Sequence, residues 1–187
     1  MLMKILFYSI VLLIAFLGYR SISMAATTLK IGDPAPDFNL PNAKSELVSL
    51  ASFKGSWVVL YFYPRDDSPI CTKQACNFRD DMHTLEKLGA KVVGVSVDDG
   101  NSHSEFAKKY NLPFPLLSDK DGAVASKYEA LSNFGFFKFA KRYTFLIDPD
   151  GVLQKTYLSV DTSRHSQQII DDLTGLKQSA LKQSAIK

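Results

Sequence analysis

The sequence predicts a single α/β domain in which three layers are built around a central mixed sheet. Two observations carry this prediction. Buried-strand patterns alternate with helical patterns in the first half of the chain, which is typical of parallel strands joined by crossover helices. Farther along, two strand-like runs are separated by the turn sequence DPDG at 148–151, which predicts an antiparallel hairpin. A sheet with both kinds of pairing is mixed.

The strands follow from residue type and from turn signals. Residues 27–50 contain three prolines between short apolar pairs, which predicts extended segments and a hairpin. The run WVVLYFY at 57–63 is dense in β-branched and aromatic residues and ends at Pro64, so it predicts a central buried strand. The run KVVGVSV at 91–97 predicts a second buried strand. The further strands are predicted at 116–117, 143–147 and 152–158.

Apolar residues at helical spacing predict the helices. Between the two buried strands, apolar side chains recur three or four residues apart over 72–88. The segment 102–110 places Phe106 and Tyr110 four residues apart, with Ser102 as the expected N-cap. The remaining helices are predicted at 123–128 and 163–176.

The domain is predicted to span 27–176 and to be followed by a tail at 177–187. The pentapeptide LKQSA occurs twice in tandem, at 176–180 and 181–185. Two copies are too few for a repeat architecture, so we interpret the tail as a frayed helical extension.

Residues 1–25 have the pattern of a signal peptide or an N-terminal anchor. A lysine precedes an apolar run from Ile5 to Leu17, and Ser23 and Ala25 have the spacing of a signal-peptidase site. The thirteen residues of this run make about 20 Å of helix, which is shorter than a bilayer core of about 30 Å. We therefore favour cleavage after Ala25, and an uncleaved anchor is the alternative. Both interpretations place the domain outside the cytoplasm.

The composition is that of an ordinary soluble fold, with 46% hydrophobic and 22% charged residues. The net charge is +3, and two of the cations, Lys4 and Arg20, lie in the leader. Without residues 1–25 the chain has 20 basic and 19 acidic residues, a balance of +1. This argues against nucleic-acid binding, which needs a basic patch.

The only two cysteines, Cys71 and Cys76, lie in one segment. In an exported protein such a pair usually forms a stabilising disulfide. On a helix that begins at Cys71, however, a step of five positions places the two Cα atoms about 8.6 Å apart, beyond the reach of about 7 Å that a disulfide allows. A disulfide between them then requires the helix to unwind locally, which is more typical of a redox-active pair than of a stabilising disulfide.

The position of Cys71 also favours a reactive thiol. A strand ends at Pro64, a loop follows, and Cys71 opens the helix, where unpaired backbone N–H groups and the helix dipole favour a thiolate. Lowering a thiol pKa from about 8.5 to about 6 accelerates attack at pH 7 by only about 30-fold. Fast chemistry therefore also needs groups that stabilise the transition state, and the candidates are the Ser68 hydroxyl, loop N–H groups and a cationic side chain.

The segment FYPRDDSPICTKQACNFRDDM at 62–82 resembles the active-site loop of the peroxiredoxins, most closely that of the bacterioferritin comigratory protein group, also called peroxiredoxin Q. The similarity continues through APDFNL, SHSEFAKKYNLPFPLLSDKDG and RYTFLIDPDGV, over roughly residues 29–173. This resemblance implies a thioredoxin-like fold and a thiol peroxidase without metal, haem or flavin. Its substrates would be hydrogen peroxide and organic hydroperoxides, and its reductant thioredoxin or a similar dithiol. We expect a monomer.

The resemblance also assigns roles to individual residues. Cys71 matches the peroxidatic cysteine, which becomes a sulfenic acid, and Cys76 matches the resolving cysteine, which closes an intramolecular disulfide. Pro64 matches the proline that shields the thiolate, and Ser68 stands where the family has a Thr or Ser that contacts the peroxide. Arg142 matches the arginine that polarises both thiolate and peroxide.

Two positions depart from the family pattern: Ile70 replaces a glycine and Gln74 replaces a glutamate. We expect both to affect substrate preference and rate without touching the residues assigned above. We also expect 65–67 to form a solvated turn and His103 to have a structural role at a helix start. The three histidines lack metal-site spacing.

Two other functions remain as alternatives from the sequence. The first is an exported thiol–disulfide oxidoreductase, although such enzymes normally have two residues between their cysteines, whereas four separate Cys71 from Cys76. The second is a non-enzymatic domain that is stabilised by a structural disulfide between Cys71 and Cys76.

Overall fold

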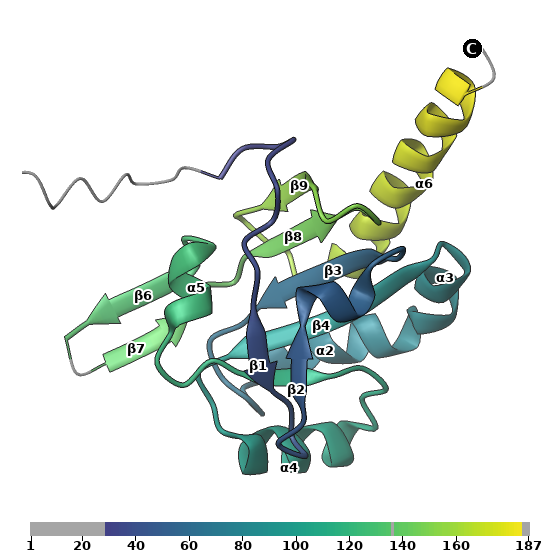
Figure 1. Ribbon diagram of the computed structural model, residues 1–187. Helices are drawn as coiled ribbons and strands as arrows, with labels where there is room; N and C mark the ends of the chain where they lie inside the picture. Colours follow the sequence, from purple (N-terminus) through teal and green to yellow (C-terminus); the bar gives the residue numbers. More distant parts are fainter. Residues whose placement is uncertain (1–28, 136, 185–187) are drawn as a thin grey trace, which may run out of the picture.

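The computed structural model describes residues 29–135 and 137–184, so the predicted leader at 1–25 lies outside the described residues. A five-stranded sheet lies at the centre, in the order β5-β4-β3-β8-β9 (Figure 1). The first three strands in this order are parallel, and β8 and β9 run antiparallel to their neighbours, which confirms the predicted mixed sheet. The strands are β3 (Trp57–Phe62), β4 (Ala90–Ser96), β5 (Leu116–Ser118), β8 (Thr144–Ile147) and β9 (Leu153–Tyr157).

Strand β3 is central because its side chains are apolar on both faces. Val58 to Phe62 are all buried, and the strand pairs with β4 from Trp57↔Ala90 to Phe62↔Val95. On its other side it pairs with β8 from Val58↔Ile147 to Tyr61↔Thr144. A strand with helices over both faces has no solvent side, so it needs no polar alternation.

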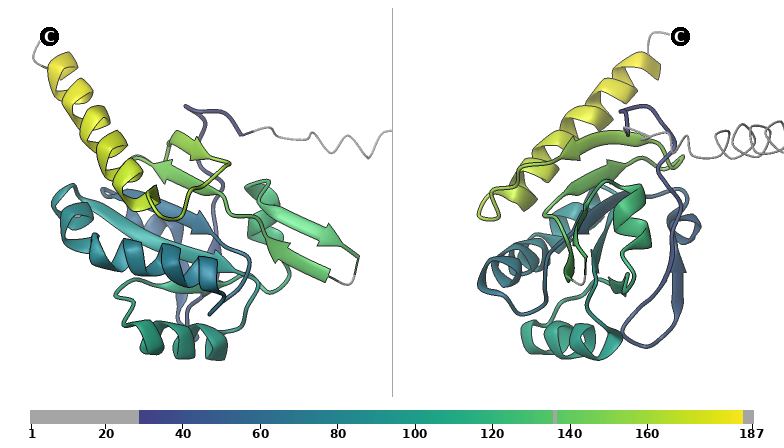
Figure 2. Two further views of the ribbon diagram at one scale, coloured as in Figure 1. Left: turned by 180° about the vertical axis from the view of Figure 1, so that it is seen from behind. Right: turned by 90° about the vertical axis from the view of Figure 1, so that its left-hand side faces the viewer.

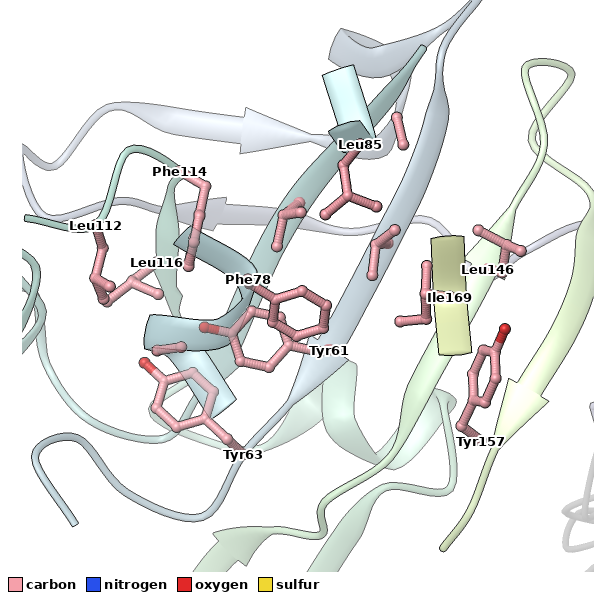
Figure 3. Packing of buried hydrophobic residues seen from close by; sticks show 14 of the residues in the cluster. Tyr61, Tyr63, Phe78, Leu85, Leu112, Phe114, Leu116, Leu146, Tyr157 and Ile169 are labelled. Carbon is pink, nitrogen blue, oxygen red and sulfur yellow. The ribbon is translucent and has the colours of Figure 1, made fainter. Parts of the chain in front are cut away.

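Successive residues of β3 supply the two halves of the core. Val59 and Tyr61 belong to the half that is covered by four helices: α2 (Pro69–Asp80), α3 (Met82–Lys87), α4 (Gly100–Tyr110) and α6 (His165–Ser184). In this half the ring of Tyr61 lies 5.4 Å from that of Tyr63 and 5.0 Å from that of Phe78 (Figure 3). The aromatic contacts anchor α2 to the sheet.

Val58, Leu60 and Phe62 face the second half of the core. This half is covered by the N-terminal segment, which contains the predicted hairpin of β1 (Asn39–Pro41) and β2 (Leu47–Ser49), followed by the 3-10 helix η1 (Leu50–Phe53). The short helix α5 (Ala123–Lys127) completes the layer. The three layers are visible in Figure 2.

Two predicted helices differ in detail from the structure. The segment 72–88 forms two helices instead of one, because Asp81 leaves the helical conformation (φ −93°, ψ 2°) and ends α2 just before α3 begins. The prediction that Ser102 is the N-cap of the helix at 102–110 was wrong. Helix α4 begins at Gly100, and the Asp99 carboxylate caps it by accepting a bond from the Ser102 N–H at 3.0 Å.

In the C-terminal half, one prediction agrees with the structure and one element was missed. Helix α6 continues past residue 176 to Ser184, in agreement with the helical extension predicted for the tail. A hairpin of β6 (Leu131–Phe134) and β7 (Phe137–Ala140) was not predicted, and it forms its own two-stranded sheet beside the central one (Figure 1). In the described ranges 29–135 and 137–184, no helix combines the length and the apolar character needed to cross a membrane.

The first residue of α6, His165, is a buried imidazole that lies between the sheet and α2. Its Nε2 hydrogen-bonds the Thr144 hydroxyl at 2.9 Å, and the rings of Phe78 and Tyr157 lie 5.7 and 5.2 Å away. Burial lowers the pKa of His165 from 6.5 to about 4, with a smaller contribution from the charge of Arg142. The folded protein therefore keeps this ring neutral at mildly acidic pH.

This burial makes stability pH-dependent. The unfolded chain protonates His165 near pH 6.5 and the folded chain only near pH 4, so stability is complete above pH 6.5 and is lost as pH falls towards 4. The loss amounts to at most about 3 kcal/mol. Urea unfolding at several pH values should show a smaller acid loss for His165→Gln, whose side chain does not titrate. Equal losses in both proteins would contradict this assignment.

Candidate active site

Cys71 lies in the first turn of α2. Ser68 is the N-cap, Pro69 is the first helical residue, and the Cys71 side chain is 2% exposed. The helix begins two residues earlier than predicted, because proline fits the first helical position, where no N–H bond is lost. The thiol still lies where unpaired amide groups and the dipole favour a thiolate.

Arg142 reaches the same thiol from the chain segment just before β8, the strand that pairs with β3. This residue lies between β7 and β8, and its Nη2 donates to the Cys71 Sγ at 3.2 Å. A guanidinium at this distance favours the charged form of sulfur by direct attraction and by a charge-assisted hydrogen bond. The structure thus brings together two residues that are 71 positions apart in the sequence.

Gln74 contacts Arg142 beside the thiol, and the expectation for Gln74 was wrong. We expected Gln74 to touch none of the assigned residues, yet its Oε1 accepts a 2.6 Å bond from Arg142 Nη1. One turn of helix places Gln74 on the same face of α2 as Cys71. The amide holds the guanidinium in place without neutralising it, so the positive charge of Arg142 acts on the sulfur of Cys71.

Cys76 lies five residues after Cys71 on the same helix, and it is half-buried. Both cysteines are free thiols in the structure. The structure therefore has the arrangement expected of a reduced protein, in which α2 is continuous from Pro69 to Asp80.

A buried carboxylate fixes the loop that precedes α2. Asp66 is only 7% exposed and accepts bonds from the Tyr63 hydroxyl at 2.7 Å, the Ser102 hydroxyl at 2.7 Å and His103 Nδ1 at 2.8 Å. Its own N–H donates to Asp98 Oδ2 at 2.8 Å. The expected solvated turn was therefore wrong for Asp66. Its burial was missed because its partners on α4 are distant in sequence.

The neighbouring Asp67 is exposed, and its side chain forms a second set of contacts between this loop and α4. It pairs with Lys109 at 2.7 Å and accepts a 2.6 Å bond from the Tyr110 hydroxyl. The bond from Lys109, with that from Tyr110, lowers the pKa of Asp67. Its backbone has a positive φ of 53°, a conformation in which aspartate is one of the tolerated residues.

The other assigned residues lie around this loop. Pro64 follows β3 and is half-buried, and the Ser68 hydroxyl donates to the Arg65 carbonyl at 3.1 Å. Tyr63 and Phe78 are core residues, as expected. Burial raises the pKa of Tyr63 well above its usual range, so its hydroxyl remains a donor to Asp66. His103 is fully buried against Asp66, in the structural position expected for it.

Comparison with known proteins agrees with this geometry. Residues 31–156 match the AhpC/TSA family. A protein of Coxiella burnetii named putative peroxiredoxin bcp is 43% identical over 150 residues, which cover 78% of this chain and 99% of that protein. Peroxiredoxin Bcp of Bacillus subtilis is 38% identical over 155 residues, which cover 81% and 99%. The chloroplastic peroxiredoxin Q of Oryza sativa subsp. japonica is 47% identical, and the match covers 67% of this chain but 58% of that longer protein.

Solved structures give the same result. The crystal structure of peroxidoxin BcpB from Mycobacterium tuberculosis matches with a TM-score of 0.75 and 32% identity, over 79% of this chain and 97% of that one. A structure of Xanthomonas campestris peroxiredoxin Q matches with a TM-score of 0.71 and 29% identity, over 79% and 96%. The matches agree with the thioredoxin-like fold predicted from the sequence. The chain therefore belongs to the AhpC/TSA family, among the Bcp and peroxiredoxin Q proteins, which are thiol-dependent peroxidases.

Proposed function

We propose that Cys71 is the peroxidatic residue of this thiol peroxidase and that Cys76 resolves its oxidised form. The observation that carries the proposal is the 3.2 Å contact between Arg142 Nη2 and the Cys71 Sγ at the start of α2. A guanidinium and a helix N-terminus both favour the thiolate, and the thiolate is the form that attacks.

The reaction begins with in-line attack of the thiolate on the terminal oxygen of a hydroperoxide. The S–O bond forms as the O–O bond breaks, and the leaving oxygen departs as water or an alcohol after taking a proton. Sulfur is oxidised to the sulfenic acid. Arg142 stabilises the negative charge as it moves from sulfur to the leaving oxygen. Ser68 would bind the peroxide, and Pro64 would shield the thiolate from water.

In the second step the Cys76 thiol attacks the sulfenic sulfur, an S–S bond forms and water leaves. An external dithiol then reduces the disulfide by exchange. The family implies a thiol reductant, and we propose thioredoxin or a similar dithiol for this role. We also propose that the protein acts as a monomer. The family match does not favour the alternative of a thiol–disulfide oxidoreductase.

We further propose that the enzyme works outside the cytoplasm, in the periplasm or an equivalent compartment. This proposal rests on the lysine, apolar run and small residues of 1–25, which have the order of a signal peptide. If the leader is retained, it anchors the domain to the membrane.

The two cysteines should differ in single-turnover experiments. Cys71→Ser should abolish peroxide consumption, because the attacking thiolate is gone. Cys76→Ser should still consume one equivalent of peroxide and then stop as a sulfenic acid or become overoxidised. Stopped-flow titration of the reduced proteins, with mass spectrometry of the products, measures both outcomes. If Cys71→Ser kept the single turnover and Cys76→Ser lost it, the roles would be reversed.

The charge of Arg142 should control the rate. Arg142→Met keeps the bulk but removes the charge, so the second-order rate with hydrogen peroxide should fall by at least about 100-fold. Gln74→Glu should lower the same rate by less than Arg142→Met does, because a carboxylate beside Arg142 offsets part of the positive charge that acts on the sulfur. Stopped-flow kinetics measure both effects. Unchanged kinetics of Arg142→Met would remove Arg142 from the reaction.

The location can be measured directly in the native host. Cell fractionation should find the protein outside the cytoplasm, and N-terminal sequencing should show a mature chain that begins near Ala26. A membrane-bound protein that retains residues 1–25 would support the anchor instead. A cytoplasmic protein with an intact Met1 would contradict both versions.

A further inference from the structure

The β6–β7 hairpin has two different faces, which follow from its register. Phe134 pairs with Phe137 and Ser132 pairs with Phe139, so these four side chains share one face. Phe134 and Phe137 are 69% and 68% exposed, and the rings of Phe134 and Phe139 stack at 6.0 Å. We call Phe134, Phe137 and Phe139 the aromatic face.

The opposite face of the hairpin packs on the core at its base only, and farther out the pair Asn133 and Lys138 on this face is exposed. Leu131 pairs with Ala140, and both pack in the half of the core that contains α5. The hairpin is therefore fixed to the body at its base, while its far end projects from the domain, as Figure 1 and the left view of Figure 2 show. The exposure of the aromatic face results from a fixed orientation of the hairpin.

The hairpin is also basic. From Ala130 to Ile147 the sequence contains Lys138, Lys141 and Arg142 and no acidic residue. The ammonium groups of Lys138 and Lys141 donate to the backbone carbonyls of Asp121 and Glu129, and within the described residues neither lysine forms an ion pair with a carboxylate. The predicted domain as a whole is almost neutral, so this segment is a local concentration of positive charge.

The hairpin lies next to the reactive thiol. Strand β7 ends at Ala140, two residues before Arg142, which contacts the Cys71 sulfur. Ile70, the residue before Cys71, is itself an exposed apolar side chain. The base of the hairpin is therefore close to the start of α2, and the aromatic face extends outward from this base.

We propose that the aromatic face docks onto the surface of an anionic phospholipid bilayer, and that Lys138 and Lys141 of the same hairpin provide the positive charge. Aromatic rings with adjacent cations are the combination that binds the membrane interface, where rings enter the headgroup region and cations meet anionic lipids. The two exposed phenylalanines offer roughly 280 Å² of apolar area, about a third of the 800 Å² per partner in a typical protein interface. The patch is therefore too small for a stable dimer.

Docking would present acyl-chain hydroperoxides of the bilayer to Cys71. This part of the inference rests on the proposed function, whereas the docking itself does not. No new chemical step is needed, because the O–O bond of a lipid hydroperoxide breaks as described above and leaves a lipid alcohol.

The docking is tested in the full-length chain with a fluorescent probe at the hairpin itself. A local probe reports whether the hairpin meets the bilayer, even where the leader also binds it. Phe134→Trp is compared with Leu47→Trp, a matched control because Leu47 is 65% exposed on the other hairpin. Vesicles of phosphatidylglycerol with brominated acyl chains should quench the added indole of Phe134→Trp and leave that of Leu47→Trp unquenched. Trp57 contributes equally to both proteins. The quenching should weaken as salt is added.

Equal quenching of the two variants, or none in Phe134→Trp, would overturn the docking. So would a concentration-dependent dimer that Phe134→Ser/Phe137→Ser abolishes, because the face would then bind a second copy.

Kinetics test the consequence for the substrate. The ratio of the rate on phospholipid hydroperoxide in vesicles to the rate on hydrogen peroxide should fall about tenfold in Phe134→Ser/Phe137→Ser, and Leu47→Ser should keep it. An unchanged ratio in the double variant would overturn delivery to Cys71. Inactivity of the unmodified protein on both peroxides would instead reject the proposed function, and the quenching result would stand on its own.

Discussion

The 3.2 Å contact between Arg142 and the Cys71 sulfur is the constraint on which the rest of the structure depends. Each residue lies just outside a strand of the central sheet: Cys71 follows β3 after a loop, and Arg142 precedes β8. Because β3 and β8 pair antiparallel, with Tyr61 opposite Thr144, the end of one strand and the start of the other meet at the same edge. A slip of two residues in this register, about 7 Å, would separate the charge from the thiol.

Much of the fold could be predicted because its strands and helices have strong local patterns. The run at 57–63 and the turn at 148–151 specify a buried strand and a hairpin without help from distant residues. The hairpin β6–β7 was missed because its apolar residues occupy both faces and give no clean alternation. Asn133 and Gly135, which has a φ of 77° at the turn, were the only local signals of that hairpin.

The site residues were predicted from two kinds of signal. Cys71 was assigned from its place at a helix start and from the resemblance, and Arg142 from the resemblance alone. Asp66 was expected on the surface, because its polarity is typical of a turn. Its burial comes from Ser102 and His103, which the fold brings to it from α4. Gln74 was different, because its place three residues after Cys71 on a helix already puts both on one face. That spacing was a signal that could have been used.

The loop and the helix beside it are held very differently, and this difference bears on the proposed disulfide. Asp66 and Asp67 fix the loop to α4, and the C-terminal half of α2 is held by buried Phe78. The first turn of α2 lies between the loop and this C-terminal half, and no side chain caps it. The side chain of Cys71 in this turn is held by the hydrogen bond from Arg142. In the proposed mechanism the thiolate becomes an uncharged sulfenic acid, so its charge-assisted bond to Arg142 weakens. In this mechanism the contact that activates the thiol also holds the first turn of α2 in place. Oxidation of Cys71 would therefore loosen the turn that must unwind before Cys71 can reach Cys76.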